Sequence, residues 1–185
     1  MRQGYNIIML YSADASRILM CRRRKDPYGG LANLIGGKIE PGEDGLSAAY
    51  REMGEESGVS RDDADLTHVM DFVYYLQDCY VEVYAGRLKR DIAVTGDENE
   101  LFWSDLGQDF FDMGLYAGEG NIGHMIEQVK MYEKEIFKHD LASPLNDNDR
   151  VSRPQTVDTS LRLKHDWRSE PEHQRAFGSA NDKQL

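Results

Sequence analysis

The sequence predicts an α/β fold in which helices cover a small mixed sheet, an α/β/α arrangement. Two observations predict it. Short apolar-rich runs typical of strands cover residues 5–11, 17–24 and 31–35, and again 66–76, 80–88 and 101–103. Apolar residues recur at three- and four-residue spacing over 44–57 and 122–139, which indicates two helices. The expected order is therefore β-β-β-α-β-β-β-α, which buries a sheet between helices.

Glycine and proline mark where these elements end. The stretch 26–30 reads Asp-Pro-Tyr-Gly-Gly and predicts a loop, Gly36-Gly37 ends the third strand, and Pro41-Gly42 predicts a turn. Gly58 stands where a helix commonly ends in a left-handed residue. The second helix is expected to bury one face, made of Ile122, Met125, Ile126, Val129, Tyr132 and Ile136.

Charge divides the chain into two parts. The 185 residues carry a formal net charge of −11, and the whole acidic excess falls within residues 1–140. Residues 141–185 are balanced in charge and poorer in hydrophobic residues. We therefore expect a folded domain over 1–140, followed over 141–185 by a polar C-terminal extension that is either disordered or docked.

Composition excludes several classes of protein. An acidic chain lacks the basic face of a duplex nucleic-acid binder, and no apolar run is long enough for a membrane helix. The strand pattern begins at Tyr5 with no visible signal peptide, and two cysteines are too few for a disulfide framework, so we expect a cytoplasmic protein. Nucleotide substrates remain open, because a metal ion can carry the phosphates. A monomer and a homodimer both remain open.

Three glutamates on the first predicted helix suggest a metal site. Glu52, Glu55 and Glu56 are spaced i, i+3 and i+4, so they project from one face and repel each other unless a cation offsets them. Oxygen ligands suit Mg²⁺, and Mn²⁺ as an alternative. The carbonyl groups of Gly36-Gly37 can approach a metal closely, and Lys38 beside them can face a phosphate.

Taken alone, three glutamates on one helix face are more typical of a solvated surface than of a metal site. Their surroundings argue for more. Gly37, Glu43, Arg51-Glu52, the apolar Met53, Glu55-Glu56, Gly58 and the apolar Val59 stand at the spacing of the Nudix signature. The chain thus resembles the Nudix hydrolase family, and the resemblance implies a Nudix-like α/β/α sandwich. Residues 141–185 lie outside it.

The resemblance implies a hydrolase that cleaves a nucleoside diphosphate linked to another group, with a divalent metal. Carried over, Glu52, Glu55 and Glu56 become metal ligands, with a backbone carbonyl from the region of Gly37. One of these glutamates, or a later one, would be the general base. Glu100 is the first candidate for that later residue and for a further metal ligand, and Glu98 is its rival. Arg51 and Glu43 would orient the acidic face.

Other residues bear on the substrate. Asn33 and Asn121 are similar in position to base-contacting asparagines of oxidised-purine nucleoside triphosphatases, and Arg23 resembles a phosphate-contacting arginine of MutT-type enzymes. A polar edge-strand residue, an ordinary helix N-cap and a solvated strand end are the respective structural alternatives. Four aromatic residues could either stack on a base or belong to the core: Phe72, Tyr74, Phe102 and Trp103.

These residues lead to three functional hypotheses. The first is a Mg²⁺-dependent pyrophosphohydrolase of the MutT type, which converts an oxidised purine triphosphate such as 8-oxo-dGTP to the nucleoside monophosphate and pyrophosphate. The second is a pyrophosphatase for ADP-ribose, a nucleotide sugar or a dinucleotide. The third, from another class, is a nucleotide-binding sensor on the same scaffold.

Overall fold

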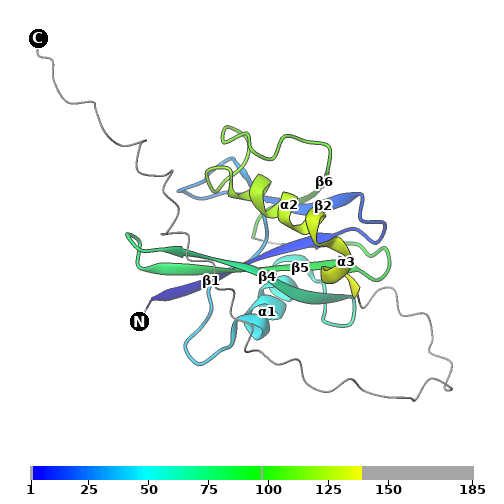
Figure 1. Ribbon diagram of the computed structural model, residues 1–185, viewed down its shortest axis with the longest axis horizontal. Coiled ribbons are helices and arrows are strands. Elements are labelled where there is room, and N and C mark those ends of the chain that lie inside the picture. Colours follow the sequence, from blue (N-terminus) through cyan, green and yellow to red (C-terminus); the bar gives the residue numbers. More distant parts are fainter. Residues whose placement is uncertain (1, 97, 139–185) are drawn as a thin grey trace, which may run out of the picture. The chain divides into compact units, whose positions relative to one another are not determined.

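The computed structural model describes residues 2–96 and 98–138 (Figure 1). The expected extension at 141–185 lies outside these residues. In chain order the elements are β1 (Gln3–Tyr11), β2 (Arg17–Arg22), β3 (Ala32–Asn33), α1 (Gly45–Ser57), β4 (Ala64–Tyr74), β5 (Cys79–Leu88), β6 (Glu100–Asp105), α2 (Asn121–Met131) and α3 (Glu133–Ile136).

The strands form one mixed sheet, as the sequence predicts. Its order is β3-β2-β1-β5-β4, and β6 pairs with β2 off this path. The central pair β1–β5 is parallel, with Ile7 opposite Val83, whereas β1–β2, β2–β3, β2–β6 and β4–β5 are antiparallel. A parallel neighbour requires a crossover, and here the chain that crosses over includes α1.

Helices cover both faces of this sheet. Side chains alternate along the central strands, so each strand contributes apolar residues to both faces. On β1, Ile8 and Leu10 join a buried cluster with Ala49 and Met53 of α1. The intervening residues Met9 and Tyr11 join a second buried cluster with the apolar face of α2, namely Ile122, Met125, Ile126 and Val129. Figure 1 shows α1 and α2 on opposite sides of the strands. The predicted α/β/α sandwich is therefore confirmed.

The second predicted helix differs from expectation. Instead of one helix over 122–139, α2 ends at Met131 and the short α3 follows, because Tyr132 leaves the helical region at φ −115° and ψ 25°. Tyr132, at the break, is 50% exposed rather than buried. Ile136 is still buried, on the far side of the break. The third strand is also shorter than predicted, since only Ala32 and Asn33 pair with β2.

Capping fixes the register of α1. The Asp44 carboxylate accepts a hydrogen bond of 3.0 Å from the backbone N–H of Ser47, which satisfies one of the free donors at the helix start. Gly58 ends the helix in the left-handed region at φ 72°, where glycine carries no steric penalty. These two residues determine which side chains of α1 face the sheet and the loop before it.

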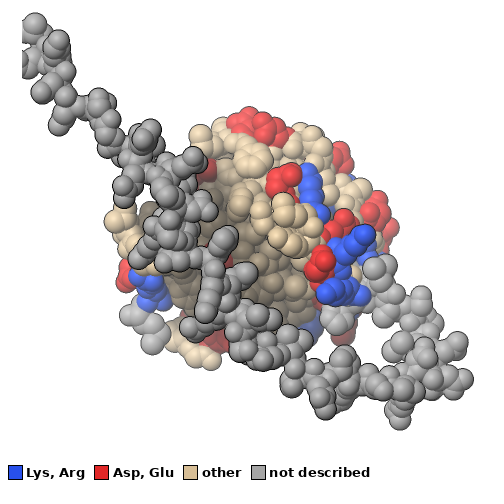
Figure 2. Space-filling view, viewed as in Figure 1, with Lys and Arg blue, Asp and Glu red and all other residues tan. Residues whose placement is uncertain are grey.

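The described surface is mixed in charge. On the face shown in Figure 2, basic side chains over α2 and α3 lie beside acidic ones. The ion pair between Lys130 and Glu127, at 2.8 Å, belongs to α2. Among residues 2–96 and 98–138, no helix is both long and apolar enough to cross a membrane.

We predict that a fragment of residues 1–140 folds without the rest of the chain. The two buried clusters reach Phe137 at their C-terminal limit, so the cut removes none of the core side chains described here. The melting temperature of the fragment should lie within a few degrees of that of the full chain, measured by circular dichroism. An unfolded fragment would instead show that residues 141–185 complete the core.

Candidate active site

The segment 35–39 lies along the start of β1 and carries the glycine loop. Three backbone hydrogen bonds hold it there: Ile8 N–H to Ile35 C=O at 2.9 Å, Asn6 N–H to Gly37 C=O at 2.8 Å, and Ile39 N–H to Gly4 C=O at 3.0 Å. Gly36 has φ 140°, and a Cβ there would collide with the backbone of Asn6. The close approach of the two segments therefore requires glycine at this position.

The glycine loop contacts two of the three predicted glutamates. The Gly36 N–H donates to Oε2 of Glu56 at 2.8 Å. The Glu52 carboxylate lies against the Cα of Gly37, in the space that a Cβ would fill. The structure thus brings the loop and the acidic face of α1 together, although they are separated in sequence by the turn at 41–44.

Glu56 is the carboxyl group whose ionisation is most disturbed. Its pKa is raised to about 7, mainly by burial and also by the negative charges of Glu52 and Glu98, against the opposing effects of the Gly36 N–H and Arg23. A carboxylate in this position gains from a nearby cation, because the cation stabilises the charged form that burial disfavours.

Arg51 ties the other carboxylates together with all three of its guanidinium nitrogens. Its Nε and Nη2 donate to Glu43 at 3.1 and 3.0 Å, a parallel pair of hydrogen bonds that fixes the plane of the group. Nη1 donates to Glu52 at 2.8 Å and to Glu55 at 3.0 Å. Nη2 also donates to the Lys38 carbonyl at 2.9 Å. Arg51 therefore links α1 to the glycine loop and partly offsets the acidic cluster.

The donor set fits a hard divalent cation in its chemistry. It consists of the carboxylate oxygens of Glu52, Glu55 and Glu56 and the nearby backbone carbonyls. The Gly37 carbonyl accepts from Asn6, which leaves it a second lone pair. As the side chains stand, no group of three His, Cys, Asp or Glu within the described ranges is arranged to hold a metal. Glu55 is 61% exposed, so it has the freedom to turn toward the other two.

A pocket of about 450 Å³ opens beside the glycine loop. Three of the four predicted substrate residues, Arg23, Asn33 and Lys38, line it together with Gly36 and Gly37. The positive charge of Arg23 also lowers the pKa of Glu56, so this pocket residue acts electrostatically on the acidic cluster. Its Nε is buried and has no hydrogen-bond partner among the described residues. An unsatisfied buried donor of this kind favours an anionic ligand.

Two predicted residues stand elsewhere. Asn121 does not line the pocket, and its Nδ2 donates to the hydroxyl of Tyr74 at 2.8 Å. Nor is it the N-cap of α2, since that position belongs to Gly120. Glu100 begins β6 opposite Arg22 and is exposed. Of the two later glutamates, Glu98 is the one whose charge acts on Glu56.

Two further residues belong to the site without having been predicted. Asn6 is buried, its Oδ1 accepts from the Gly37 N–H at 3.2 Å, and its Nδ2 has no partner within the described part of the chain. A polar residue within the apolar run 5–11 was the available signal. Tyr28 lines the pocket from a loop, where no periodicity could identify it. The four aromatic candidates Phe72, Tyr74, Phe102 and Trp103 are not among the pocket residues.

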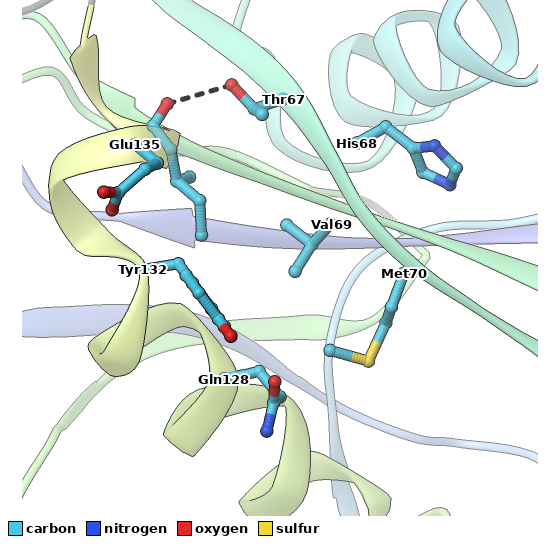
Figure 3. Close-up of a pocket in the computed structure, with 8 residues that line it drawn as sticks. Thr67, His68, Val69, Met70, Gln128, Tyr132 and Glu135 are labelled. Atoms are coloured by element: carbon cyan, nitrogen blue, oxygen red, sulfur yellow. Dashed lines mark hydrogen bonds between the residues drawn. The ribbon is translucent and has the colours of Figure 1, made fainter. Parts of the chain in front are cut away.

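A second, smaller pocket of about 280 Å³ lies between β4 and the helices α2 and α3 (Figure 3). Val69 and Met70 point into it from the strand, facing Tyr132 of the helix break. Thr67 closes one end by donating to the backbone carbonyl of Ile136 at 2.9 Å. This pocket contains none of the predicted site residues.

We predict that Glu56→Gln raises the melting temperature of the protein in excess chelator, and most strongly at high pH. The pKa of Glu56 is raised from 4.5 to about 7, so the cost of its ionisation to the folded state is complete above pH 7. This cost shrinks as the pH falls through 7 and is absent below about 4.5. Glutamine keeps an oxygen for the Gly36 N–H. The melting temperatures of both proteins should be compared at about pH 8 and pH 5, and a variant effect of equal size at both would contradict the prediction.

Comparisons with known proteins were made for the whole chain. No curated protein sequence matches it. Among solved structures, a C. elegans Ap4A hydrolase binary complex is similar with TM-score 0.59 and 17% identity, covering 72% of this chain and 99% of that one. The NUDIX domain of Shewanella oneidensis NrtR, complexed with ADP ribose, has TM-score 0.58 and 17% identity, covering 72% and 89%.

A third solved structure is described as MutT from Aliivibrio salmonicida and Vibrio cholerae. It has TM-score 0.53 and 20% identity, covering 71% of this chain and 99% of that one. At these identities the three structures establish the fold. The family rests on a separate finding, a family model described as the NUDIX domain, which matches residues 2–108. Because that match spans more than half of the chain, the protein belongs to the Nudix hydrolase family.

Proposed function

We propose that this protein is a Mg²⁺-dependent pyrophosphohydrolase that cleaves a nucleoside triphosphate to the nucleoside monophosphate and pyrophosphate, with an oxidised purine such as 8-oxo-dGTP as the first candidate. The proposal rests on one observation: the glycine loop borders both the acidic cluster and the pocket. Gly36 and Gly37 contact Glu56 and Glu52 while also lining a pocket with Arg23, Asn33 and Lys38. The pocket and the acidic cluster thus meet at one loop.

The chemistry of the acidic cluster supports hydrolysis of a phosphoric anhydride. Glu52, Glu55 and Glu56 would hold the divalent metal that members of this family generally use. Such a metal would lower the pKa of the attacking water and neutralise charge on the phosphates. The water oxygen would form a bond to the attacked phosphorus while the bridging P–O bond breaks and the bridging oxygen leaves with the other product, and one proton of the water would pass to a carboxylate of the cluster. Arg51, whose Nη1 donates to both Glu52 and Glu55, would hold these two carboxylates in place.

The lining of the pocket supports a nucleoside with acceptor groups on its base. Oδ1 of Asn33 accepts from the backbone N–H of Leu34 at 2.9 Å, which leaves the amide nitrogen to donate to a base. Purines with 6-oxo or 8-oxo groups offer such acceptors. Arg23 and Lys38 supply positive charge for phosphates on the side toward the acidic cluster. The volume of about 450 Å³ lies within the usual range for a small-molecule site.

A hydrolysis screen tests the proposal. The full chain is incubated with Mg²⁺ and 8-oxo-dGTP, dGTP, dATP, ADP-ribose, NADH and dinucleoside polyphosphates, in ¹⁸O-labelled water. We expect monophosphate and pyrophosphate from the triphosphates, fastest from 8-oxo-dGTP, and the labelled product identifies the attacked phosphorus. Glu55→Gln and Glu56→Gln should each lower turnover by roughly 100-fold or more. Glu127→Gln on α2 is the matched control.

The other outcomes of the screen are informative. If ADP-ribose or a dinucleotide is cleaved fastest, that substrate class would replace the nucleoside triphosphate in the proposal. Tight nucleotide binding without cleavage of any substrate would overturn the proposed hydrolase activity and favour a nucleotide-binding sensor. Near-normal turnover in both glutamine variants would remove the assignment of the metal site.

We further predict that Mg²⁺ raises the melting temperature of the protein. A ligand that binds only the folded state stabilises it by mass action, and here it also relieves repulsion among glutamates of one helix face. Millimolar MgCl₂ should shift the melting temperature of the wild type, and Glu52→Gln or Glu56→Gln should reduce that shift. NaCl at the same ionic strength controls for screening. No shift in the wild type would count against the site.

A further inference from the structure

One wall of the pocket is an aromatic ring whose position does not follow from the strands. Tyr28 lies in the loop between β2 and β3, lines the pocket and is half-buried. Hydrogen bonds from Gly30 N–H to Arg23 C=O at 2.8 Å and from Leu31 N–H to Tyr28 C=O at 3.0 Å close the loop. These bonds fix the backbone of Tyr28 but leave its ring to be oriented by other contacts.

The ring is tethered at its hydroxyl end. Tyr28 donates to the two carboxylate oxygens of Glu119, at 3.0 and 3.1 Å, although the residues are 91 positions apart. Burial and this hydrogen bond both raise the pKa of Tyr28, so the hydroxyl stays protonated and remains a donor. The contact joins two loops across one side of the pocket.

The backbone at Glu119 is held in a conformation that a side chain rarely adopts. Its φ is 52°, and it stands between Gly118 at 79° and Gly120 at 88°. For a residue other than glycine, the left-handed region is costly and persists only where the surroundings enforce it. Here α2 begins directly afterwards at Asn121, whose side chain is bound to Tyr74. From this backbone position, the Glu119 carboxylate accepts the hydrogen bond of Tyr28.

The frame around this contact is pinned to the sheet. Ala32 of β3 donates to the Leu115 carbonyl and accepts from the Ala117 N–H, both at 2.9 Å. The loop that carries Glu119 and the loop that carries Tyr28 therefore meet at the same short strand. Within this frame, the hydrogen bonds to Glu119 restrain the hydroxyl end of the ring, beside the Gly118 backbone, which also interacts with that hydroxyl.

We propose that Tyr28 stacks on the base of the bound nucleotide and that Glu119 is the positioning residue that holds the ring in place. The proposal rests on the proposed function, since it needs a nucleotide in this pocket. A base gains from an aromatic surface on its face, and a ring already fixed in the bound orientation loses less freedom on binding. The other aromatic residue among those that line the pocket, Tyr5, lies on β1, whereas Tyr28 lies in a loop.

A double-mutant cycle in the full chain tests this. The dissociation constants of dGMP and 8-oxo-dGMP are measured by calorimetry, and KM and kcat for the best triphosphate by assay of pyrophosphate. Tyr28→Leu should raise the dissociation constants and KM by about tenfold, and kcat should stay within twofold. Tyr28→Phe and Glu119→Ala should each raise the constants by about threefold, and the double variant no further, because both remove the same bond.

Tyr132→Leu is the matched control, since Tyr132 is a tyrosine that lines the other pocket. Unchanged affinity in Tyr28→Leu, or additive effects of Tyr28→Phe and Glu119→Ala, would overturn the inference. Those results leave the proposed function standing as long as the wild type still cleaves nucleotides. A wild type that neither binds nor cleaves any nucleotide overturns the proposed function itself.

Discussion

The site depends on the close approach of the segment 35–39 to the start of β1. Three backbone hydrogen bonds hold the two together, and side chains at Gly36 or Gly37 would collide with Asn6 or Glu52. Without this approach, the Gly36 N–H would not reach Glu56, and the pocket would lose the part of its lining that Gly36 and Gly37 form. The same loop therefore decides both where the carboxylates lie and where a ligand can enter.

The carboxylates of the acidic cluster differ in how their negative charge is compensated. Arg51 offsets Glu43, Glu52 and Glu55 through hydrogen bonds, whereas Glu56 is compensated mainly by one backbone N–H and remains hard to ionise. Part of the net charge of −11 is therefore concentrated at α1, where the glutamates repel one another. This geometry carries an electrostatic cost of the kind that a nearby cation would lower.

The predicted residues differ in how well local pattern could place them. The glutamates lie within about one helix turn, so helical spacing suffices to place them on one face. Arg23 follows β2, Asn33 ends β3 and Lys38 follows the glycine loop. Position along the chain predicts Asn121 and Glu100, but in the structure Asn121 donates to Tyr74, and Glu98 is the later glutamate whose charge acts on Glu56. Tyr28 and Asn6 had weak or no periodic signal.

The sequence by itself determined the mixed α/β/α architecture, the C-terminal end of α1 and the face that carries Glu52, Glu55 and Glu56. These follow from periodicity, from Gly58 as the residue that ends the helix, and from fixed spacing, all of which act over a few residues. Only the tertiary structure decided the pocket, the break at Tyr132 and the contact between Tyr28 and Glu119. These depend on how distant segments pack against one sheet, and no local pattern encodes which loop meets which.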